Sequence, residues 1–313
     1  MCNIWQQKKT KELSLDQIRD MLDDPIFNTI EHVILSGGEP SLREDIGSIA
    51  RLFVEKCHSL KLIDVPTNGL VPELSIKACY AINEACKKSN VNFAFSISLD
   101  GLGDIHATVR GVPNGFEKTM NTIEAMKVLK SKFDFRLHLH CVVTNANVHG
   151  LSELIDWCSQ EGLPFSFELA HNWKRFMNEN GLFHLTNEQK SIFLNALWTR
   201  VKQPAGNEYH WMTYRMINSG KKRYLTCPFV VNAFSVQPDG KVYYCPGSES
   251  IGNVHEDKLS NIYYDKRNLE LREWINRNEC ASCTQSIWWY ALNKNLLRNL
   301  HYNVIKRIIT IGG

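Results

Sequence analysis

The sequence contains no long hydrophobic run and no excess of charge of one sign. Nowhere in its 313 residues do about 18 apolar residues follow one another, the length that a membrane-spanning helix needs. Its 36 Lys and Arg residues against 33 Asp and Glu give a net charge of +3, which does not indicate a protein that coats nucleic acid. The first ten residues, MCNIWQQKKT, lack the apolar core of a signal peptide. We therefore expect a cytoplasmic protein with no integral membrane association and no nucleic-acid partner.

Cysteine, in contrast, is abundant, with ten residues. Disulfides are rare in a reducing cytosol, so cysteines at defined spacings more often bind metal or take part in catalysis. Five of the ten stand singly within apolar patterns, and we expect them to be buried as small hydrophobic residues: Cys57, Cys79, Cys86, Cys141 and Cys158. The candidates for chemistry are the other five: Cys2, Cys227, Cys245, Cys280 and Cys283.

Strand-like and helix-like segments alternate between residues 14 and 171. Ser14 and Gln17 form the pattern of a capping box, which predicts that a helix begins there. The predicted strands span 32–36, 62–67, 92–100, 135–144 and 165–171, and the predicted helices span 14–23, 43–56, 72–88, 115–131 and 151–161. Repeated strand–helix units favour parallel strands joined by right-handed crossovers, so we expect an α/β fold.

Three of the predicted strands have one apolar and one polar face. In residues 92–100 the apolar face carries Phe93, Phe95 and Ile97, and the later strands place His138, His140 and Glu168 on their polar faces. Parallel strands that are buried on both faces usually read as continuous apolar runs. Each unpaired polar group in a dry core would cost about 1–3 kcal/mol, so the pattern favours an interior that holds ligand and water. For any single strand, polar residues that satisfy one another are the alternative.

The pattern divides the chain into three parts. Residues 1–171 form the strand–helix part, 172–225 a less regular helical connector, and 226–313 a small cysteine-rich module. Pro238-Asp239-Gly240 predicts a tight turn between short strands in that module. Residues 291–313 have a basic amphipathic pattern, which predicts a C-terminal helix that packs on the module. A helix lying on an anionic membrane surface is the alternative.

Short motifs stand at the ends of the predicted strands. The first is Gly37-Gly38-Glu39-Pro40, and the others follow in order: Thr67-Asn68-Gly69, Ser96-Ile97-Ser98-Leu99-Asp100-Gly101, Val109-Arg110-Gly111 and Val143-Thr144-Asn145. In order, spacing and position these motifs resemble those of the radical S-adenosylmethionine (SAM) enzymes, over nearly the whole of residues 1–170. The resemblance implies a partial (β/α)6 barrel, similar to a TIM barrel but with its first strand missing, followed by the small hairpin-and-helix module.

The family binds a 4Fe–4S cluster through three cysteines, spaced C-x3-C-x2-C, in the loop after its first strand. Cys2 stands where the third of these belongs, and the sequence contains neither the other two nor the first strand. One thiolate does not replace three, because a cluster is held by its full ligand set. Two explanations stay open: an upstream extension supplies the strand and the two cysteines, or the chain is a fragment or an inactive copy.

The spacing of Cys227, Cys245, Cys280 and Cys283 resembles the SPASM domain in its shorter, twitch form, which holds one auxiliary 4Fe–4S cluster. Four thiolates suit a tetrahedral zinc ion equally well on chemical grounds. The rival to an enzyme is therefore a non-catalytic, zinc-stabilised barrel that binds a nucleotide-like ligand. Next to a radical SAM core, the auxiliary cluster is the favoured interpretation.

The resemblance also implies a reaction. A reduced 4Fe–4S cluster cleaves SAM to a 5′-deoxyadenosyl radical, which abstracts a hydrogen atom from a substrate that is then oxidised. The substrate class stays open between a peptide and a small molecule such as a sugar-like cyclitol. A flavodoxin or a ferredoxin is the expected electron donor. The bond chemistry belongs to the cofactors, while the protein binds and orients them and excludes water.

The residues that match the family's SAM-binding positions are Gly37, Gly38, Glu39, Asn68, Ser98, Asp100, Arg110 and Asn145. The resemblance places the SAM amino group at the backbone of 37–39, the ribose near Ser98 and Asp100, and the ribose or adenine near Asn145. Arg110 would pair with the SAM carboxylate, which a guanidinium binds in bidentate fashion, unless it only caps a loop. Side-chain alternation alone makes His138, His140 and Glu168, with Asp64, the candidates for a catalytic acid or base.

Overall fold

A computed structural model describes residues 3–6, 10–173, 176–178, 184–202, 208–224, 227, 229, 232–278, 280–284 and 307–312. Five parallel strands form its first part, in the order β5-β4-β3-β2-β1. They span β1 Ile30–Ser36, β2 Leu62–Thr67, β3 Asn92–Ser98, β4 Arg136–Val143 and β5 Phe165–Leu169. All five strands predicted from the alternating pattern are present, so the predicted α/β half-barrel is confirmed.

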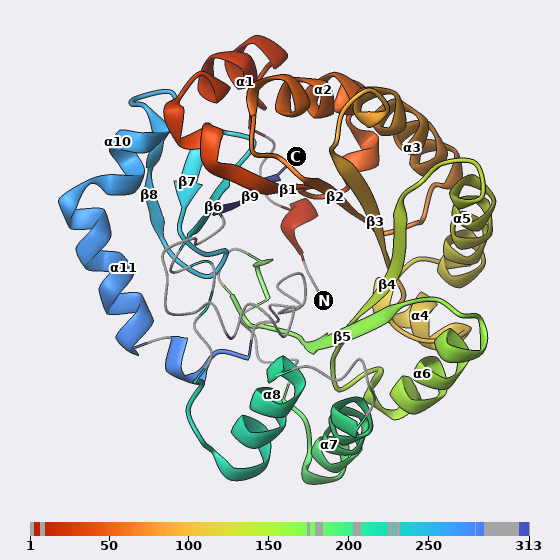
Figure 1. Cartoon of the computed structure of the whole chain (residues 1–313). Helices are drawn as coiled ribbons and strands as arrows, with labels where there is room; N and C mark the ends of the chain where they lie inside the picture. Colours follow the sequence, from red (N-terminus) through yellow and green to blue (C-terminus); the bar gives the residue numbers. More distant parts are fainter. Residues whose placement is uncertain are drawn as a thin grey trace.

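Helices cover the outer face of the curved sheet formed by these strands (Figure 1). They are α1 Leu15–Leu22, α2 Ile46–Lys56, α3 Pro72–Cys86, α4 Asp104–Arg110, α5 Gly115–Lys130 and α6 Leu151–Gln160. The capping box at the start of α1 is formed as predicted, since Gln17 N donates to Ser14 Oγ and Ser14 N donates to Gln17 Oε1. Helix α4 was not predicted. Among the described residues, no helix has the length and apolar character needed to cross a membrane.

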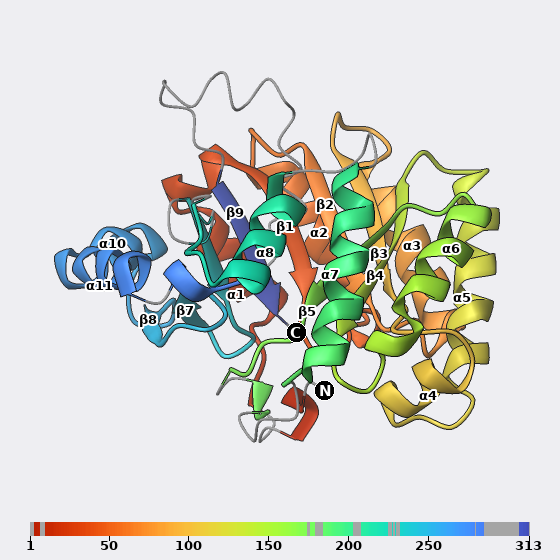
Figure 2. The same cartoon turned by 90° about the horizontal axis from the view of Figure 1, so that it is seen from below.

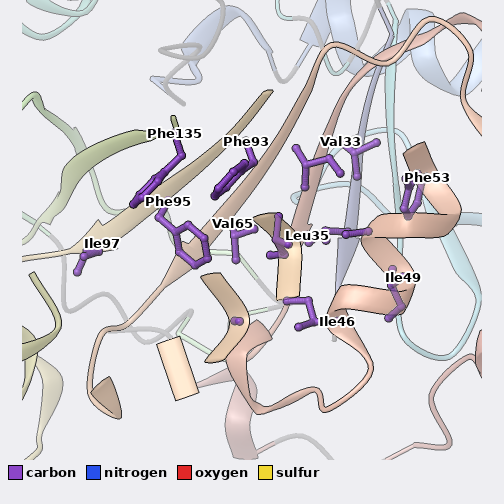
Figure 3. Close-up of a cluster of buried hydrophobic side chains, with 14 of the residues drawn as sticks. Val33, Leu35, Ile46, Ile49, Phe53, Val65, Phe93, Phe95, Ile97 and Phe135 are labelled. Atoms are coloured by element: carbon purple, nitrogen blue, oxygen red, sulfur yellow. The ribbon is translucent and has the colours of Figure 1, made fainter. Parts of the chain in front are cut away.

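The apolar faces of the strands form the core between the sheet and its helices. Phe93, Phe95 and Ile97 of β3 are buried, and they belong to one apolar cluster with Leu35 of β1, which lies beside Ile46 of α2 (Figure 3). Phe93 also stacks on Phe135, the residue just before β4, with ring centroids 5.1 Å apart. The five singly placed cysteines lie in this core, as predicted. The opposite, polar faces of the strands therefore line the interior of the half-barrel.

The connector and the C-terminal module extend this sheet. Helices α7 Asn187–Lys202 and α8 Glu208–Ser219 pack side by side next to β5 (Figures 1 and 2). An antiparallel set follows, with β6 Ala233–Val236, β7 Lys241–Tyr243 and β8 Ser250–Asn253, and then α10 Leu259–Tyr264 and α11 Lys266–Asn278. The predicted turn joins β6 to β7, and Gly240 takes the left-handed conformation with φ +82°. The predicted division of the chain at 171 and 225 stays a prediction.

The predicted C-terminal helix is wrong for the residues described there. Residues 307–312 form strand β9 (Arg307–Gly312), which pairs in parallel with β1 on one side and with β6 on the other. The sequence Ile308-Ile309-Thr310-Ile311 is a run of β-branched residues, which favours a strand over a helix. The amphipathic spacing therefore carried less weight than this local preference. The rest of the predicted helix, 291–306, lies outside the described residues.

A buried carboxylate joins the N-terminal part to the C-terminal module. Asp24 Oδ1 accepts from Ile26 N at 3.0 Å, at the start of the short 3-10 helix Pro25–Thr29. Asp24 Oδ2 accepts from Ser260 N at 2.7 Å, in the first turn of α10. One side chain thus satisfies two helix N-termini that are more than 230 residues apart in the sequence.

We predict that Asp24→Ala lowers the free energy of unfolding by about 1–3 kcal/mol, because two backbone N–H groups lose their acceptor at a buried position. Urea denaturation followed by circular dichroism measures the loss. Asp20→Ala is the matched control, since Asp20 is exposed on the neighbouring helix. Equal stability of the two variants would show that Asp24 does not join the two parts.

Candidate functional site

The carboxylate of Glu39 connects the loops that follow β1 and β2. Its Oε1 accepts from Ser41 N at 3.1 Å, from Ser41 Oγ at 2.7 Å and from Thr67 Oγ1 at 2.9 Å. Its Oε2 accepts from Asn68 N at 2.7 Å. The side chain of Glu39 therefore has a structural role, and it brings the Gly37-Gly38 backbone next to the Thr67-Asn68-Gly69 loop. The exposed Gly38 and half-buried Asn68 remain accessible at this rim.

A second network begins at Asp100, after β3. Asp100 is 1% exposed; its Oδ1 accepts from Val142 N at 3.0 Å, and its Oδ2 lies 2.7 Å from Arg110 Nε. The N–H of Arg110 is not aligned with that oxygen, so the contact is an ion pair rather than a hydrogen bond. Protein thus encloses the Asp100 carboxylate, which holds Arg110 in place. The expected contact of Asp100 with a ribose stays a prediction.

His106 extends this network to the β2 loop. Burial lowers the pKa of His106 to about 4, so the ring is neutral at pH 7. Its Nδ1 accepts from Asp100 N at 3.0 Å, which leaves the proton on Nε2, 3.2 Å from Thr119 Oγ1. Thr119 in turn donates to Asn68 O at 3.4 Å. The strand ends at β1, β2 and β3 are thus linked by side chains.

Asn147 is a functional position that sequence reasoning missed. Its Oδ1 accepts from Thr144 N at 2.7 Å, and its Nδ2 donates to Asp100 O at 2.9 Å and to Val142 O at 3.0 Å. Asn147 therefore shapes the loop after β4, whereas the predicted Asn145 is exposed and its carbonyl accepts from Gln189 Nε2 at 2.8 Å. A Thr followed three residues later by Asn after a strand was the available signal.

The polar faces of β2 to β5 bring the predicted acid–base candidates together. Ser96 Oγ donates to Asp64 Oδ1 at 2.9 Å and lies 3.4 Å from His138 Nδ1. One step further along the strands, His140 Nδ1 lies 2.9 Å from Ser166 Oγ, and His140 Nε2 lies 3.5 Å from Glu168 Oε1. The register pairs Ser98 with His140 and His140 with Ser166, so these groups share the interior face.

Burial decides the charge of the deeper pair. It raises the pKa of Asp64 from 3.8 to about 6, against the opposing effect of the hydrogen bond from Ser96. Burial, with a smaller contribution from the neighbouring His140, lowers the pKa of His138 to about 3. The deeper layer therefore holds an imidazole that is neutral at pH 7 and a carboxyl that loses its proton only near pH 6. The His140–Glu168 pair, nearer the carboxyl end of the strands, lies closer to the rim motifs.

An aromatic contact joins the end of β5 to the cysteine-rich module, and it too was missed from the sequence. The ring of His171 stacks on Trp173, with centroids 4.8 Å apart and planes 16° apart. A Cβ placed on Gly247 would lie 2.8 Å from the indole atoms Cε2 and Nε1 of Trp173, so the indole lies directly on this glycine. Gly247 N donates to Cys245 Sγ at 3.4 Å. Burial lowers the pKa of His171, and the charges of Glu168 and Arg223 have smaller effects of opposite sign on it.

Four cysteines gather in the module. Cys227 is buried, and Cys245 and Cys280 pack against the same small apolar cluster. Burial raises the pKa of the Cys245 thiol, and the thiols of Cys227, Cys280 and Cys283 raise it further, so all four lie within electrostatic reach. Two contacts from the connector fix the last loop: Arg223 Nη1 donates to Cys283 O at 3.0 Å and Tyr209 Oη donates to Thr284 O at 2.9 Å.

The donor chemistry of this quartet fits an iron–sulfur cluster or zinc, since thiolates are soft ligands. Within the described ranges, no three His, Cys, Asp or Glu side chains are placed to hold a single metal ion. Cys2 lies outside the described residues, so its predicted role as a ligand stays a prediction.

Comparison with family models decides the relationship. The model of the radical SAM superfamily matches residues 1–158, just over half of the chain. The chain belongs to the radical SAM superfamily. A second model, the SPASM iron-sulfur cluster-binding domain, matches residues 227–284 and contains all four cysteines of the quartet. The family resemblance predicted from the strand-end motifs is confirmed, and the family implies SAM and iron–sulfur clusters as cofactors.

Curated relatives divide into two groups. Two synthases match about half of this chain: pre-heme d1 synthase of Dinoroseobacter shibae (28% identical, 51% of this chain and 36% of the relative) and AdoMet-dependent heme synthase of Methanosarcina barkeri (29%, 48% and 40%). The sporulation killing factor maturation protein SkfB of Bacillus subtilis is 22% identical over 84% of this chain and 60% of its own length. The chain thus spans between about a third and three fifths of these relatives.

Solved structures confirm the fold. Native anSMEcpe with bound AdoMet matches 94% of this chain and 84% of its own, with a TM-score of 0.64 and 18% identity. The same protein with bound AdoMet and the Kp18Cys peptide matches 90% of this chain and 80% of its own, with a TM-score of 0.60 and 16% identity. The radical SAM half-barrel and the C-terminal module are therefore arranged in this chain as in a known SAM-binding protein fold.

We predict that Asp64→Asn becomes increasingly stabilising, relative to the parent chain, as the pH rises from 4 to 7. The folded-state pKa of about 6 lies above the unfolded value of 3.8, so folded Asp64 keeps its proton while the unfolded chain releases it. Stability therefore falls as the pH rises through this window, by about 3 kcal/mol in total, and asparagine removes that loss.

Urea denaturation at pH 4, 5, 6 and 7 measures this difference. Asp134→Asn, an exposed position just before β4, is the control and should give a difference that does not change with pH. A parallel pH dependence of the two variants would show that the Asp64 carboxyl is not protonated in the folded state.

Proposed function

We propose that this chain is the catalytic part of a radical SAM enzyme that oxidises a peptide, with an auxiliary 4Fe–4S cluster held by Cys227, Cys245, Cys280 and Cys283. The observation that carries the proposal is the continuity between the polar interior and the quartet. Glu168 lies near the end of β5, and His171, just beyond that strand, stacks its ring on Trp173. Trp173 covers Gly247, whose amide binds Cys245 Sγ.

The relatives support a peptide over a tetrapyrrole. The heme synthases match only about half of this chain, whereas the maturation protein SkfB matches 84% of it. A relative that matches across both the half-barrel and the module is the better guide to the substrate. The fold neighbour is also known with a bound peptide. No observation on this chain favours the cyclitol that the resemblance left open.

The rim residues would bind SAM. The backbone of Gly37 and Gly38 is accessible beside the Asn68 loop, where it can receive the amino group. Arg110, fixed by the buried Asp100, can pair with the carboxylate. We assign Ser98, at the end of β3, to the ribose and Asn145, after β4, to the ribose or adenine. When bound, SAM and a reduced cluster supply the radical that removes a hydrogen atom from the substrate.

The His140–Glu168 pair is placed to take the proton that leaves an oxidised substrate. Ser166 Oγ lies at His140 Nδ1, so Nε2 is the atom that faces the Glu168 carboxylate. A proton accepted at this pair would be shared between an imidazole nitrogen and a carboxylate oxygen. His138 lies deeper, and burial keeps it neutral. We therefore propose that it orients Ser96 and Asp64 and does not transfer a proton.

We predict that the anaerobically reconstituted chain binds about four iron atoms and about four sulfides at the quartet, and that Cys280→Ser abolishes this binding. Iron and sulfide analysis with the visible absorption spectrum measures it. Cys86→Ala is the matched control, because Cys86 is a core cysteine of α3, far from the module in sequence and fold. A colourless protein with one zinc per chain would instead support the zinc-stabilised binding protein.

We further predict that peptide, and not a tetrapyrrole, stimulates formation of 5′-deoxyadenosine with SAM and a chemical reductant. The assay uses the chain extended upstream by a strand and two cysteines, because Cys2 alone does not hold the core cluster. Arg110→Lys should raise the KM for SAM about tenfold or more, because the ammonium group loses the bidentate contact. Liquid chromatography with mass spectrometry measures both the nucleoside and the loss of hydrogen from the peptide. Stimulation by a porphyrin alone would contradict the assignment.

A further inference from the structure

An exposed aromatic patch lies on the outer face of α7 and α8. Trp198 and Trp211 are 39% and 36% exposed, and Tyr214 connects them, with ring centroids 5.2 Å from Trp198 and 5.9 Å from Trp211. Tyr224, just after α8, is 43% exposed. Large exposed aromatic groups on neighbouring helices are uncommon on a surface that faces only water. We call these four residues, with Lys202 and Arg215, the α7–α8 patch.

The patch is strongly basic. Lys202 Nζ lies 5.1 Å from the ring centroid of Trp198, and the guanidinium of Arg215 lies 5.2 Å from that of Tyr224. The exposed Lys221 and Lys222 follow directly. Residues 187–224 contain seven Lys and Arg against two Glu, whereas the rest of the chain contains 29 against 31. Arg200 and Arg223 bind the backbone carbonyls of Phe165 and Cys283, and the five other basic residues of this segment favour an acidic partner.

The other face of α8 packs on the cysteine quartet. Tyr209, Met212 and Met216 form a buried cluster with Cys227, and Cys245 and Cys280 pack against that cluster. Tyr209 Oη and Arg223 Nη1 hold the backbone of Thr284 and Cys283. A single helix, about 10 Å across, therefore separates the quartet from the patch. Figure 2 shows α7 and α8 at the front of the molecule, with no other labelled element over them.

We propose that the α7–α8 patch docks a small acidic electron-transfer protein that takes electrons from the auxiliary centre. This rests on the proposed function, because it assumes a redox-active cluster at the quartet. Loss of a hydrogen atom leaves the substrate as a radical, and its further oxidation releases one proton and one electron. The His140–Glu168 pair would take the proton, and a cluster held by the four cysteines would take the electron. The oxidised one-electron centre of the partner would then accept that electron and be reduced, which would ready the enzyme for another turnover.

The ring arrangement favours a protein over a nucleic acid. Single-stranded nucleic acid uses aromatic residues whose ring faces are open for stacking with bases. Here Trp211 and Tyr214 stack on each other, with planes 10° apart, and Lys202 lies over Trp198. Rings packed in this way can contact a protein partner through their edges. Trp, Tyr and Arg contribute most of the binding energy in protein–protein interfaces.

Binding and electron transfer test the proposal on the full reconstituted chain. The probes are an oxidised flavodoxin and an oxidised plant-type ferredoxin, both acidic, with titration calorimetry at low and at moderate salt. Stopped-flow spectroscopy follows reoxidation of the prereduced auxiliary centre by each probe. The variants are Trp211→Ala and the double charge reversal Lys221→Glu with Lys222→Glu. Trp274→Ala on α11 and Lys118→Glu on α5 are matched controls, since both residues are exposed on other faces.

We expect at least one probe to bind, with affinity that falls as salt is added. Trp211→Ala and the double reversal should each raise Kd about tenfold and slow reoxidation at limiting probe, while both controls stay within about twofold. The proposal is overturned if neither probe binds, if the patch variants bind as the controls do, or if single-stranded RNA binds the patch and displaces the probes. The absorption spectrum reports the cluster separately, so failure of the proposed function is seen independently of docking.

Discussion

The geometry of the rim depends on one carboxylate that accepts four hydrogen bonds. Glu39 receives donors from its own loop and from the loop after β2, and the contact continues through Asn68, Thr119 and His106 to the backbone of Asp100. Each member is held by groups on a different element, so the loops that follow three strands keep a fixed spacing. Backbone amides can bind a charged ligand well only when such a frame holds them in advance of binding. The Gly-Gly-Glu-Pro motif therefore combines an open backbone with a side chain that fixes it.

The interior shows how a polar lumen is kept stable. A carboxyl at Asp64 and an imidazole at His138 are both buried, and each is bound through the hydroxyl of Ser96. Burial raises the pKa of Asp64 to about 6 and lowers that of His138 to about 3, so at pH 7 the imidazole is neutral and the carboxyl is mostly ionised. The layer above contains the His140–Glu168 pair, with Nε2 3.5 Å from Oε1. The lumen thus has two layers of polar groups that bind one another, and the second lies nearer the strand ends.

The sequence predicted the elements that a local signal defines. Alternation along the chain marked five strands because side chains of a strand point to opposite faces, and motifs at the strand ends indicated the family. Contacts between distant residues were not predictable in this way. Nothing local marks His171 and Trp173 as the bridge to Gly247, because that contact depends on how the module folds back onto β5. Asp100 was assigned from its motif, and only the structure shows that protein encloses its carboxylate. Strand β9 was misassigned as helix because apolar spacing was given more weight than β-branching.

Strand β9 also determines the order in which this sheet can form. It pairs His32 with Ile308 and Ala233 with the same Ile308, so a segment near the end of the sequence lies between the half-barrel strands and the hairpin of the module. Pairings across such a separation close very large loops and are made late in folding. Until they are made, β1 and β6 each present an unpaired parallel edge, and exposed edges are the sites where chains associate wrongly. The six residues of β9 therefore cover two sheet edges at once and protect both from pairing with other chains.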